Sequence, residues 1–231
     1  MSSILAIETS TELASVALLH NGVVFARESS GVTTHSQTIL PMVQMVLADA
    51  AIRLQDCTAI AYGAGPGSFT GVRTACGIAQ GLAYGLQLPV LPVVTLHALA
   101  LACHEKNQAR DILTVIDARM GEVYWAQYHF DHGWQTMIAP TLSVAREVQP
   151  SGEVIACGNG LTAYANDFSV PIVESGMPTL MPHARQIALL GAEALARGES
   201  VAASAAEPLY LRNKVALTSA ERAEKNSREA A

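Results

Sequence analysis

The sequence predicts an α/β protein built from two similar halves. Short apolar runs at 4–8 and 113–117 end in the carboxylates Glu8 and Asp117, and each is followed by two more strand-like segments. Helix-like segments follow both groups of strands, an order typical of mixed sheets that carry helices on their faces. The second group begins about half a chain length after the first, so we predict a duplicated architecture.

The first half is predicted to hold five strands and three helices. The strands are expected at 4–8, 15–19, 23–27, 59–63 and 90–94, and the helices at 36–51, 71–86 and 95–107. His20-Asn21-Gly22 predicts a tight hairpin turn between the second and third strands. Thr33, Thr34 and Ser36 can cap the first helix, and Pro41 must lie in its first turns or bend it.

The second half is predicted to be less regular. Strands are expected at 113–117, 123–130, 134–138 and 153–157, followed by a Gly-Asn-Gly loop, a helix at 182–197 and an extended stretch at 207–212. We place an N-terminal lobe at 1–108 and a C-terminal lobe at 109–217. The charged, apolar-poor segment 218–231 is expected to form a flexible tail.

Composition and charge limit the classes of function. Hydrophobic residues make up 50% of the chain and charged residues 15%, which predicts a well-filled core. No apolar stretch reaches the roughly 18 residues of a membrane span, and no signal peptide is visible, so we expect a cytoplasmic protein. Cys57, Cys76, Cys103 and Cys157 form no Cys-x-x-Cys pair and are expected to be reduced core thiols. A net charge of −6 with 14 basic residues predicts weak RNA binding by the chain alone.

The segment from Gly63 to Gly71 is the most unusual stretch of the sequence. Its glycines at 63, 65, 67 and 71 lead from a strand into a helix, where free amides favour an anion. The segment matches neither a P-loop nor a dinucleotide fingerprint. Two interpretations stay open, a cradle for a phosphate or carboxylate and a tight strand–helix connection capped by Ser68 or Thr70.

No catalytic residues and no metal ligands are predicted. Ser68 lacks the Gly-x-Ser-x-Gly context of a nucleophile elbow. The seven histidines do not form a pair spaced by four residues, as a helical zinc site requires.

A degenerate nucleotide cleft is predicted between the lobes, formed by Glu8, Thr9, Ser10, Asp117 and Arg119. Glu8 and Asp117 end the first strand of each half, and a two-lobed cleft can bring them together around a metal and a phosphate. The turn after Glu8 is small and polar, whereas Ala118-Arg119-Met120 is bulky where a phosphate-binding hairpin needs small residues. Arg119 can pair with a phosphate, but we favour the interpretation that these side chains fill the cleft.

Two helices are predicted to present a surface for a partner. Gly77, Gly81 and Gly85 form a stripe on the helix at 71–86, and each costs about 1 kcal/mol relative to alanine unless a contact compensates. Met42 and Met45 lie off the apolar stripe of the helix at 36–51 and suit an adaptable surface. A contact within the chain explains the same pattern, and both interpretations stay open.

Several motifs together resemble one bacterial family, TsaB, formerly called YeaZ. They cover nearly the whole chain and are, in order, Ile-Leu-Ala-Ile-Glu-Thr-Ser-Thr at 4–11, His-Ser-Gln-Thr-Ile-Leu-Pro at 35–41, Gly-Ala-Gly-Pro-Gly-Ser-Phe-Thr-Gly-Val-Arg at 63–73, Ile-Asp-Ala-Arg-Met-Gly-Glu-Val-Tyr at 116–124 and Glu-Pro-Leu-Tyr-Leu-Arg at 207–212. The resemblance implies the two-lobed actin/Hsp70/sugar-kinase-like fold.

The resemblance also implies a role in tRNA modification. TsaB proteins act with the paralogue TsaD and the ATPase TsaE, which transfer a threonylcarbamoyl group from threonylcarbamoyl-AMP to N6 of the adenosine 3′ to the anticodon. Thr95 and Leu99 stand where TsaD has its two metal-binding histidines. This implies a non-catalytic subunit that binds no cofactor alone, pairs with TsaD or with itself, and meets tRNA only in the complex. A glycoprotease and an ATP-dependent kinase are the alternatives within the same superfamily.

Overall fold

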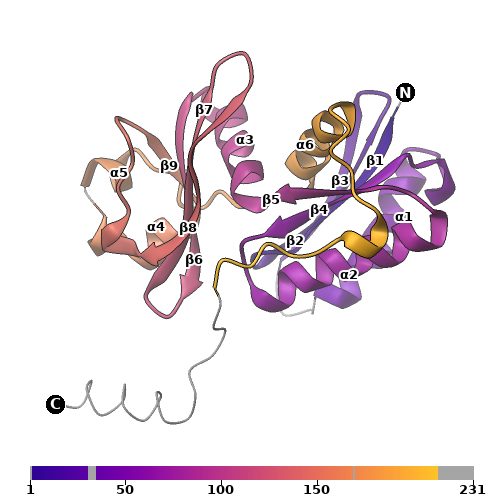
Figure 1. Ribbon diagram of the computed structural model, residues 1–231, viewed down its shortest axis with the longest axis horizontal. Coiled ribbons are helices and arrows are strands. Elements are labelled where there is room, and N and C mark those ends of the chain that lie inside the picture. Colours follow the sequence, from indigo (N-terminus) through magenta and orange to yellow (C-terminus); the bar gives the residue numbers. More distant parts are fainter. Residues whose placement is uncertain (1, 31–34, 169, 213–231) are drawn as a thin grey trace, which may run out of the picture.

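The protein folds into two units that lie side by side, each a sheet with helices on both faces (Figure 1). The computed structural model describes residues 2–30, 35–168 and 170–212. The first sheet has the order β3-β2-β1-β4-β5. Its strands are β1 (Ser3–Glu8), β2 (Leu13–His20), β3 (Val23–Ser30), β4 (Ala59–Gly65) and β5 (Val90–Val94). β1, β2 and β3 form an antiparallel meander, and β4 and β5 run parallel to β1.

Alternating side chains of the central strands fill two cores. Leu5 and Ile7 point to the face covered by α1 (His35–Asp49) and α2 (Phe69–Leu86). Ile4 and Ala6 point to the opposite face, covered by α6 (Ala184–Ala196). β1 is buried on both faces, which explains its continuous apolar run.

The second sheet repeats the plan with one strand fewer. Its order is β8-β7-β6-β9. The strands are β6 (Asp111–Arg119), β7 (Glu122–Phe130), β8 (Trp134–Val144) and β9 (Ile155–Cys157). β6, β7 and β8 form the second meander, and β9 runs parallel to β6. The two meanders therefore confirm the predicted duplication.

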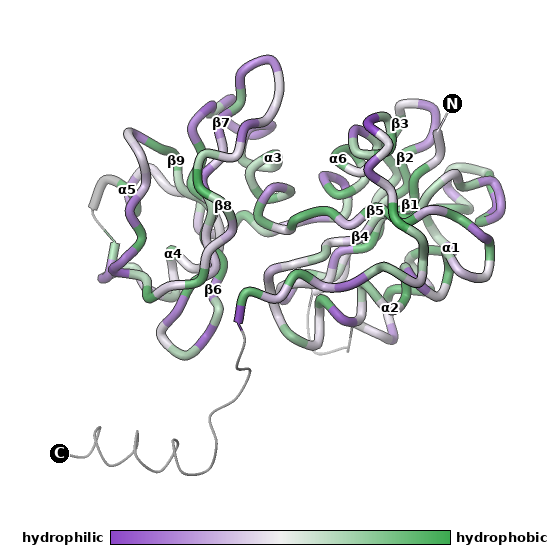
Figure 2. The backbone as a smooth tube through the Cα atoms, in the orientation of Figure 1, coloured by the Kyte–Doolittle hydropathy of each residue, from purple (hydrophilic) through white to green (hydrophobic). Residues whose placement is uncertain are grey.

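Helices cover both faces of the second sheet as well. α3 (Thr95–Asn107) packs on one face with Ile112 and Ile116. α4 (Gly160–Ala163) and α5 (Val170–Glu174) lie on the other face, over Leu113 and Val115. In Figure 2 the central strands are largely apolar, and the tip of the β7–β8 hairpin is polar.

The predicted boundary between the lobes needs correction. α6 packs against β1, β2 and β4 of the first sheet, although it lies in the range 109–217 assigned to the second lobe. After α6 the chain stays on the first lobe, where Val201 pairs with Val90 and the Leu209 amide donates to the Ala64 carbonyl. The first lobe is therefore built from both ends of the described chain.

The local predictions hold with small shifts. Asn21 and Gly22 both have positive φ, as a hairpin turn of the Asn-Gly type requires. Pro41 lies inside α1, while the predicted caps Thr33 and Thr34 fall outside the described residues. In the described part of the chain, no helix is both long and apolar enough to cross a membrane.

Candidate functional site

A hollow of about 410 Å³ lies between the two lobes. Its walls are the β1–β2 turn, the start of α2, the β6–β7 hairpin and the segment 209–212. Ser10, Asp117 and Arg119 line the hollow as the sequence predicts, whereas Glu8 and Thr9 lie behind its wall, fully buried.

The carboxyl group of Glu8 fills the space left by the missing side chain of Gly63. A Cβ atom on Gly63 would lie only 1.8 Å from Glu8 Oε2. Oε1 accepts the amide of Ser10, and Oε2 has no hydrogen-bond partner within the described residues. Burial raises the pKa of Glu8, and hydrogen bonds from Ser10, Thr9 and Thr95 oppose the shift only in part. Glu8 is thus a core carboxyl group and not an open ligand for a cation.

The glycine segment makes close backbone contacts with the β1–β2 turn. A Cβ atom on Gly71 would lie 1.9 Å from the carbonyl oxygen of Thr9, and one on Gly67 would lie 2.6 Å from Ser10. The Thr9 hydroxyl donates to the Gly71 carbonyl at 2.7 Å, and the Ser68 amide donates to the Ser10 carbonyl at 2.7 Å. Ser68 Oγ accepts from the Gly71 amide and caps α2. These are the contacts of a tight strand–helix connection, the second of the two interpretations.

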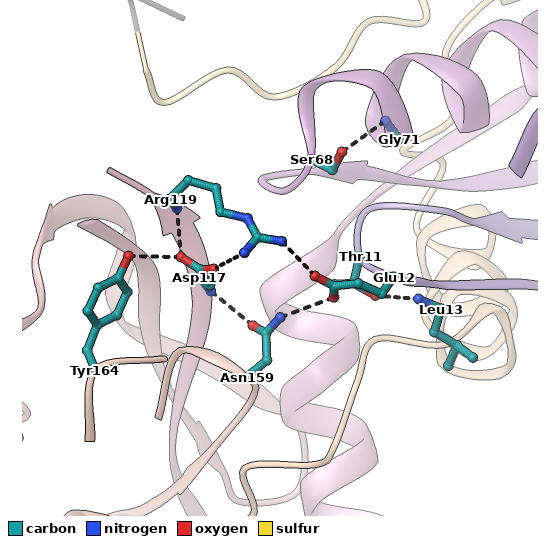
Figure 3. Close-up of polar contacts among 9 residues, drawn as sticks. All are labelled: Thr11, Glu12, Leu13, Ser68, Gly71, Asp117, Arg119, Asn159 and Tyr164. Carbon is teal, nitrogen blue, oxygen red and sulfur yellow. Dashed lines mark hydrogen bonds and ion pairs between the residues drawn. The ribbon is translucent and has the colours of Figure 1, made fainter. Parts of the chain in front are cut away.

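Arg119 occupies the centre of the cleft (Figure 3). The pairing of β6 with β7 shifts between Asp117 and Arg119, and Arg119 has a φ of 62°. Its guanidinium group pairs with Asp117 at 3.0 Å and, across the lobes, with Glu12 at 2.9 Å. Asp117 therefore already pairs with a cation inside the cleft.

Neighbouring polar groups complete this network (Figure 3). The Tyr164 hydroxyl donates to Asp117 Oδ1 at 3.0 Å. Asn159 accepts from the Asp117 amide at 2.9 Å and donates to Glu12 Oε2 at 3.3 Å, so it bridges the lobes as Arg119 does. Glu8 is not part of the network, and the cleft does not bring the two predicted carboxylates to one point.

Glu12, Asn159 and Tyr164 were not predicted as site residues from the sequence. The Gly-Asn-Gly loop was the available signal for Asn159, because a Cβ atom on Gly158 would lie 2.2 Å from the carbonyl of Val115. The loop must therefore pack directly on β6, which places Asn159 beside Asp117.

The segment 207–212 closes one side of the cleft. Tyr62 donates to the Glu207 carbonyl at 2.8 Å, and Arg73 Nε donates to the Tyr210 hydroxyl at 2.7 Å. Arg212 pairs with Glu122 at the base of the β6–β7 hairpin. The segment thus runs from the first lobe to the second beside the hollow.

The residues of the predicted partner surface are exposed only in part. Gly77, Gly81 and Gly85 face open space, since an added Cβ atom would meet nothing within 4 Å. Met45 is 49% exposed. Met42 is buried at 6% exposure among the core residues of the first lobe, so its assignment to an outer surface was wrong. The apolar face extends instead to Leu40 and Tyr84, which are 48% and 76% exposed.

The described residues offer no obvious reactive centre. Among them no three His, Cys, Asp or Glu side chains lie together as a metal site. Thr95 is buried and accepts the Gly65 amide, and Leu99 is part of the core.

Proteins of one known family are similar to this chain in sequence. A family model described as TsaD, tRNA N6-adenosine threonylcarbamoyltransferase, matches residues 27–220. The tRNA threonylcarbamoyladenosine biosynthesis protein TsaB of Escherichia coli is 45% identical over 222 residues, which are 92% of this chain and 96% of that protein. TsaB of Haemophilus influenzae is 36% identical over 225 residues, with 92% and 94% covered. The chain belongs to the TsaB branch of the TsaD family.

A solved structure agrees with the membership in the TsaB family. The structure described as YeaZ from Pseudomonas aeruginosa matches with a TM-score of 0.85 and 38% identity, covering 91% of this chain and 100% of that one. The TsaB fold is an actin/Hsp70/sugar-kinase-like arrangement of two mixed sheets with flanking helices, as the motifs implied.

The buried carboxyl group of this TsaB-family cleft predicts a specific pH dependence. Because the pKa of Glu8 is higher in the folded state than in the unfolded state, the protonated side chain stabilises the fold. This contribution is fully present below the unfolded-state pKa and is lost as the pH rises through the folded-state pKa. Glu8→Gln removes the ionisation, so the variant should gain stability relative to the natural chain as the pH rises above the unfolded-state pKa of Glu8. Urea unfolding at several pH values measures the difference, with the exposed Glu153→Gln as control. Parallel pH profiles for Glu8→Gln and the natural chain would contradict the assignment.

Proposed function

We propose that the chain is a non-catalytic cytoplasmic subunit that supports TsaD and TsaE in tRNA modification. The reaction is the transfer of a threonylcarbamoyl group from threonylcarbamoyl-AMP to N6 of the adenosine 3′ to the anticodon, in tRNAs that read codons starting with A. The observation that carries the proposal is the position of Arg119 in the cleft, because its guanidinium group neutralises Asp117 and bridges to Glu12. The relatives named for threonylcarbamoyladenosine biosynthesis support the pathway.

The contacts of the cleft argue against the enzymatic alternatives. A peptidase would need Ser68 as its nucleophile, but Ser68 Oγ accepts from the Gly71 amide and caps α2. For a kinase, a phosphate would have to displace Arg119 from two carboxylates. Within the described residues no three His, Cys, Asp or Glu side chains lie together as a site for a catalytic metal.

The net charge of −6 supports an indirect role in tRNA binding. Affinity for nucleic acid depends largely on neutralising phosphates with basic residues, and the chain has 14 of them against 20 acidic ones. We therefore assign the main tRNA contact to the partner subunits.

The surface for the paralogue is the outer face of α1 and α2. The two helices contact each other on the same side of the first sheet. Their outer face combines the bare backbone of Gly77, Gly81 and Gly85 with the exposed apolar side chains of Leu40 and Met45. Close helix packing suits such a face, and TsaD would offer an equivalent pair of helices. Alone, the same face can pair with a second copy around a two-fold axis.

An arginine at Gly81 tests this assembly. The position is open, so Gly81→Arg should fold normally, yet the long charged side chain would prevent close helix approach and leave a buried charge. We expect a monomer in sedimentation analysis, at least a roughly 100-fold loss of dimer affinity, and no support of threonylcarbamoylation by TsaD and TsaE.

The matched control for this test is Gly133→Arg. Gly133 is equally open but lies at the β7–β8 turn, away from the two helices. The control should dimerise and support modification like the natural chain. A folded Gly81→Arg variant that still dimerises and still supports the reaction would show that the partner uses another face.

Nucleotide binding by the isolated chain should be weak. Because Arg119 occupies the cleft, we expect ATP to bind with a dissociation constant larger than about 0.1 mM. That limit corresponds to a binding free energy of roughly 5.5 kcal/mol. Calorimetry on the pure chain measures this constant. Micromolar affinity would contradict the blocked cleft, and turnover of ATP or hydrolysis of casein would contradict the non-catalytic role.

The chain should also carry no zinc or iron of its own. Thr95 and Leu99 offer no metal ligand of the kind that TsaD is expected to use there. Elemental analysis of the purified chain should give less than about one tenth of an equivalent of either metal. One tightly bound zinc or iron per chain would overturn the proposed role.

A further inference from the structure

Three sulfur atoms from separate segments meet beneath the surface of the second lobe. Cys103 lies on α3, Cys157 ends β9, and Met177 follows α5. Cys103 Sγ and Met177 Sδ are 3.8 Å apart. Cys157 packs in the same core cluster as these two residues, and its thiol donates to the Leu99 carbonyl at 3.9 Å. Cys157 and Met177 pair directly in a parallel bridge. Each of the three residues therefore neighbours the other two.

Backbone hydrogen bonds hold this cluster in place. The Met177 amide donates to the Ala156 carbonyl at 2.8 Å, and the Gly158 amide donates to the Met177 carbonyl at 3.1 Å. Cys103 and Cys157 are completely buried. Met177 is only partly buried, so one member of the cluster reaches the surface.

We propose that Cys103, Cys157 and Met177 form a binding site for a soft monovalent cation, specifically Cu(I). Thiolate and thioether sulfurs are the ligands that select Cu(I) among the common metals. A metal–sulfur bond of about 2.3 Å places two sulfurs of a trigonal site about 4 Å apart. The Cys103–Met177 distance of 3.8 Å already matches that spacing. The ion would lie between the sulfurs and replace both thiol protons, which pass to the solvent without any change of oxidation state.

The donor set favours this ion over zinc. Zinc in structural sites takes four ligands from cysteine, histidine or carboxylate side chains. Within the described residues no third side chain of those types joins the two cysteines. The third donor is a thioether, which suits Cu(I) and is a poor ligand for zinc.

The exposed side chain of Asn107 gives a route to the cluster. Its Nδ2 lies 3.4 Å from Met177 Sδ and 3.9 Å from Cys103 Sγ, so the amide covers both sulfurs. Asn107 itself lies on the surface, so we expect a Cu(I) ion to enter past this side chain.

Anaerobic titration of the full chain with Cu(I), in competition with bicinchoninate, tests the proposal. We expect one Cu(I) per chain, and loss of affinity by about 100-fold or more in Cys103→Ser and in Cys157→Ser. The matched control is the double variant Cys57→Ser and Cys76→Ser, which removes two buried thiols from the first lobe and should bind Cu(I) unchanged. Binding that survives either serine variant, or is lost in the control, would overturn the site, as would equal affinity for zinc.

A methionine variant keeps the test valid if the serine variants fail to fold. Met177→Leu preserves size and both thiols, and should weaken Cu(I) binding by about ten-fold. X-ray absorption of the Cu(I) form should show three sulfur neighbours in the natural chain and two in Met177→Leu. An unchanged affinity and an unchanged sulfur count in this variant would show that the thioether is not a ligand.

Discussion

The guanidinium group of Arg119 is the contact on which the arrangement of the cleft depends. It joins Asp117 of the second lobe to Glu12 of the first, and Asn159 makes a parallel connection to the same carboxylate. The pair with Glu12 is exposed, so its contribution to stability is at most about 1 kcal/mol. Its importance is positional, because it holds the Arg119 side chain across the hollow between the lobes. The backbone supports that position, since Arg119 adopts the left-handed backbone conformation that residues other than glycine seldom adopt.

Other contacts keep the lobes from separating. α3 packs on the second sheet and also touches β4, β5 and α6 of the first lobe. Trp134 contacts the apolar cores of both lobes. The segment after α6 crosses from Val201 beside β5 to Arg212 beside Glu122. These contacts connect the lobes at several separate places.

Much of the fold could be predicted from the sequence because local patterns determine it. Short apolar runs and the Asn21-Gly22 turn identify the first meander without tertiary information. The sheet on which α6 packs could not be predicted, since periodicity marks an apolar face but not its partner. Met42 was misplaced for a related reason, because the apolar face of α1 is wider than the stripe read from the sequence. Glu12, Asn159 and Tyr164 meet only in three dimensions, from positions far apart in the chain.

The blocked cleft and the open helical face are connected through β1 and the first core. The start of α2 packs directly against the β1–β2 turn. No space is left between Gly71 and the Thr9 carbonyl, so this contact fixes the start of the helix. The buried face of α2 packs on the same core as α1, so its outer face with Gly77 and Gly81 is held rigidly. Rigid surfaces lose little conformational entropy when they associate, and their affinity benefits accordingly. The partner face that we propose is thus carried by a helix whose start is fixed in the wall of the cleft.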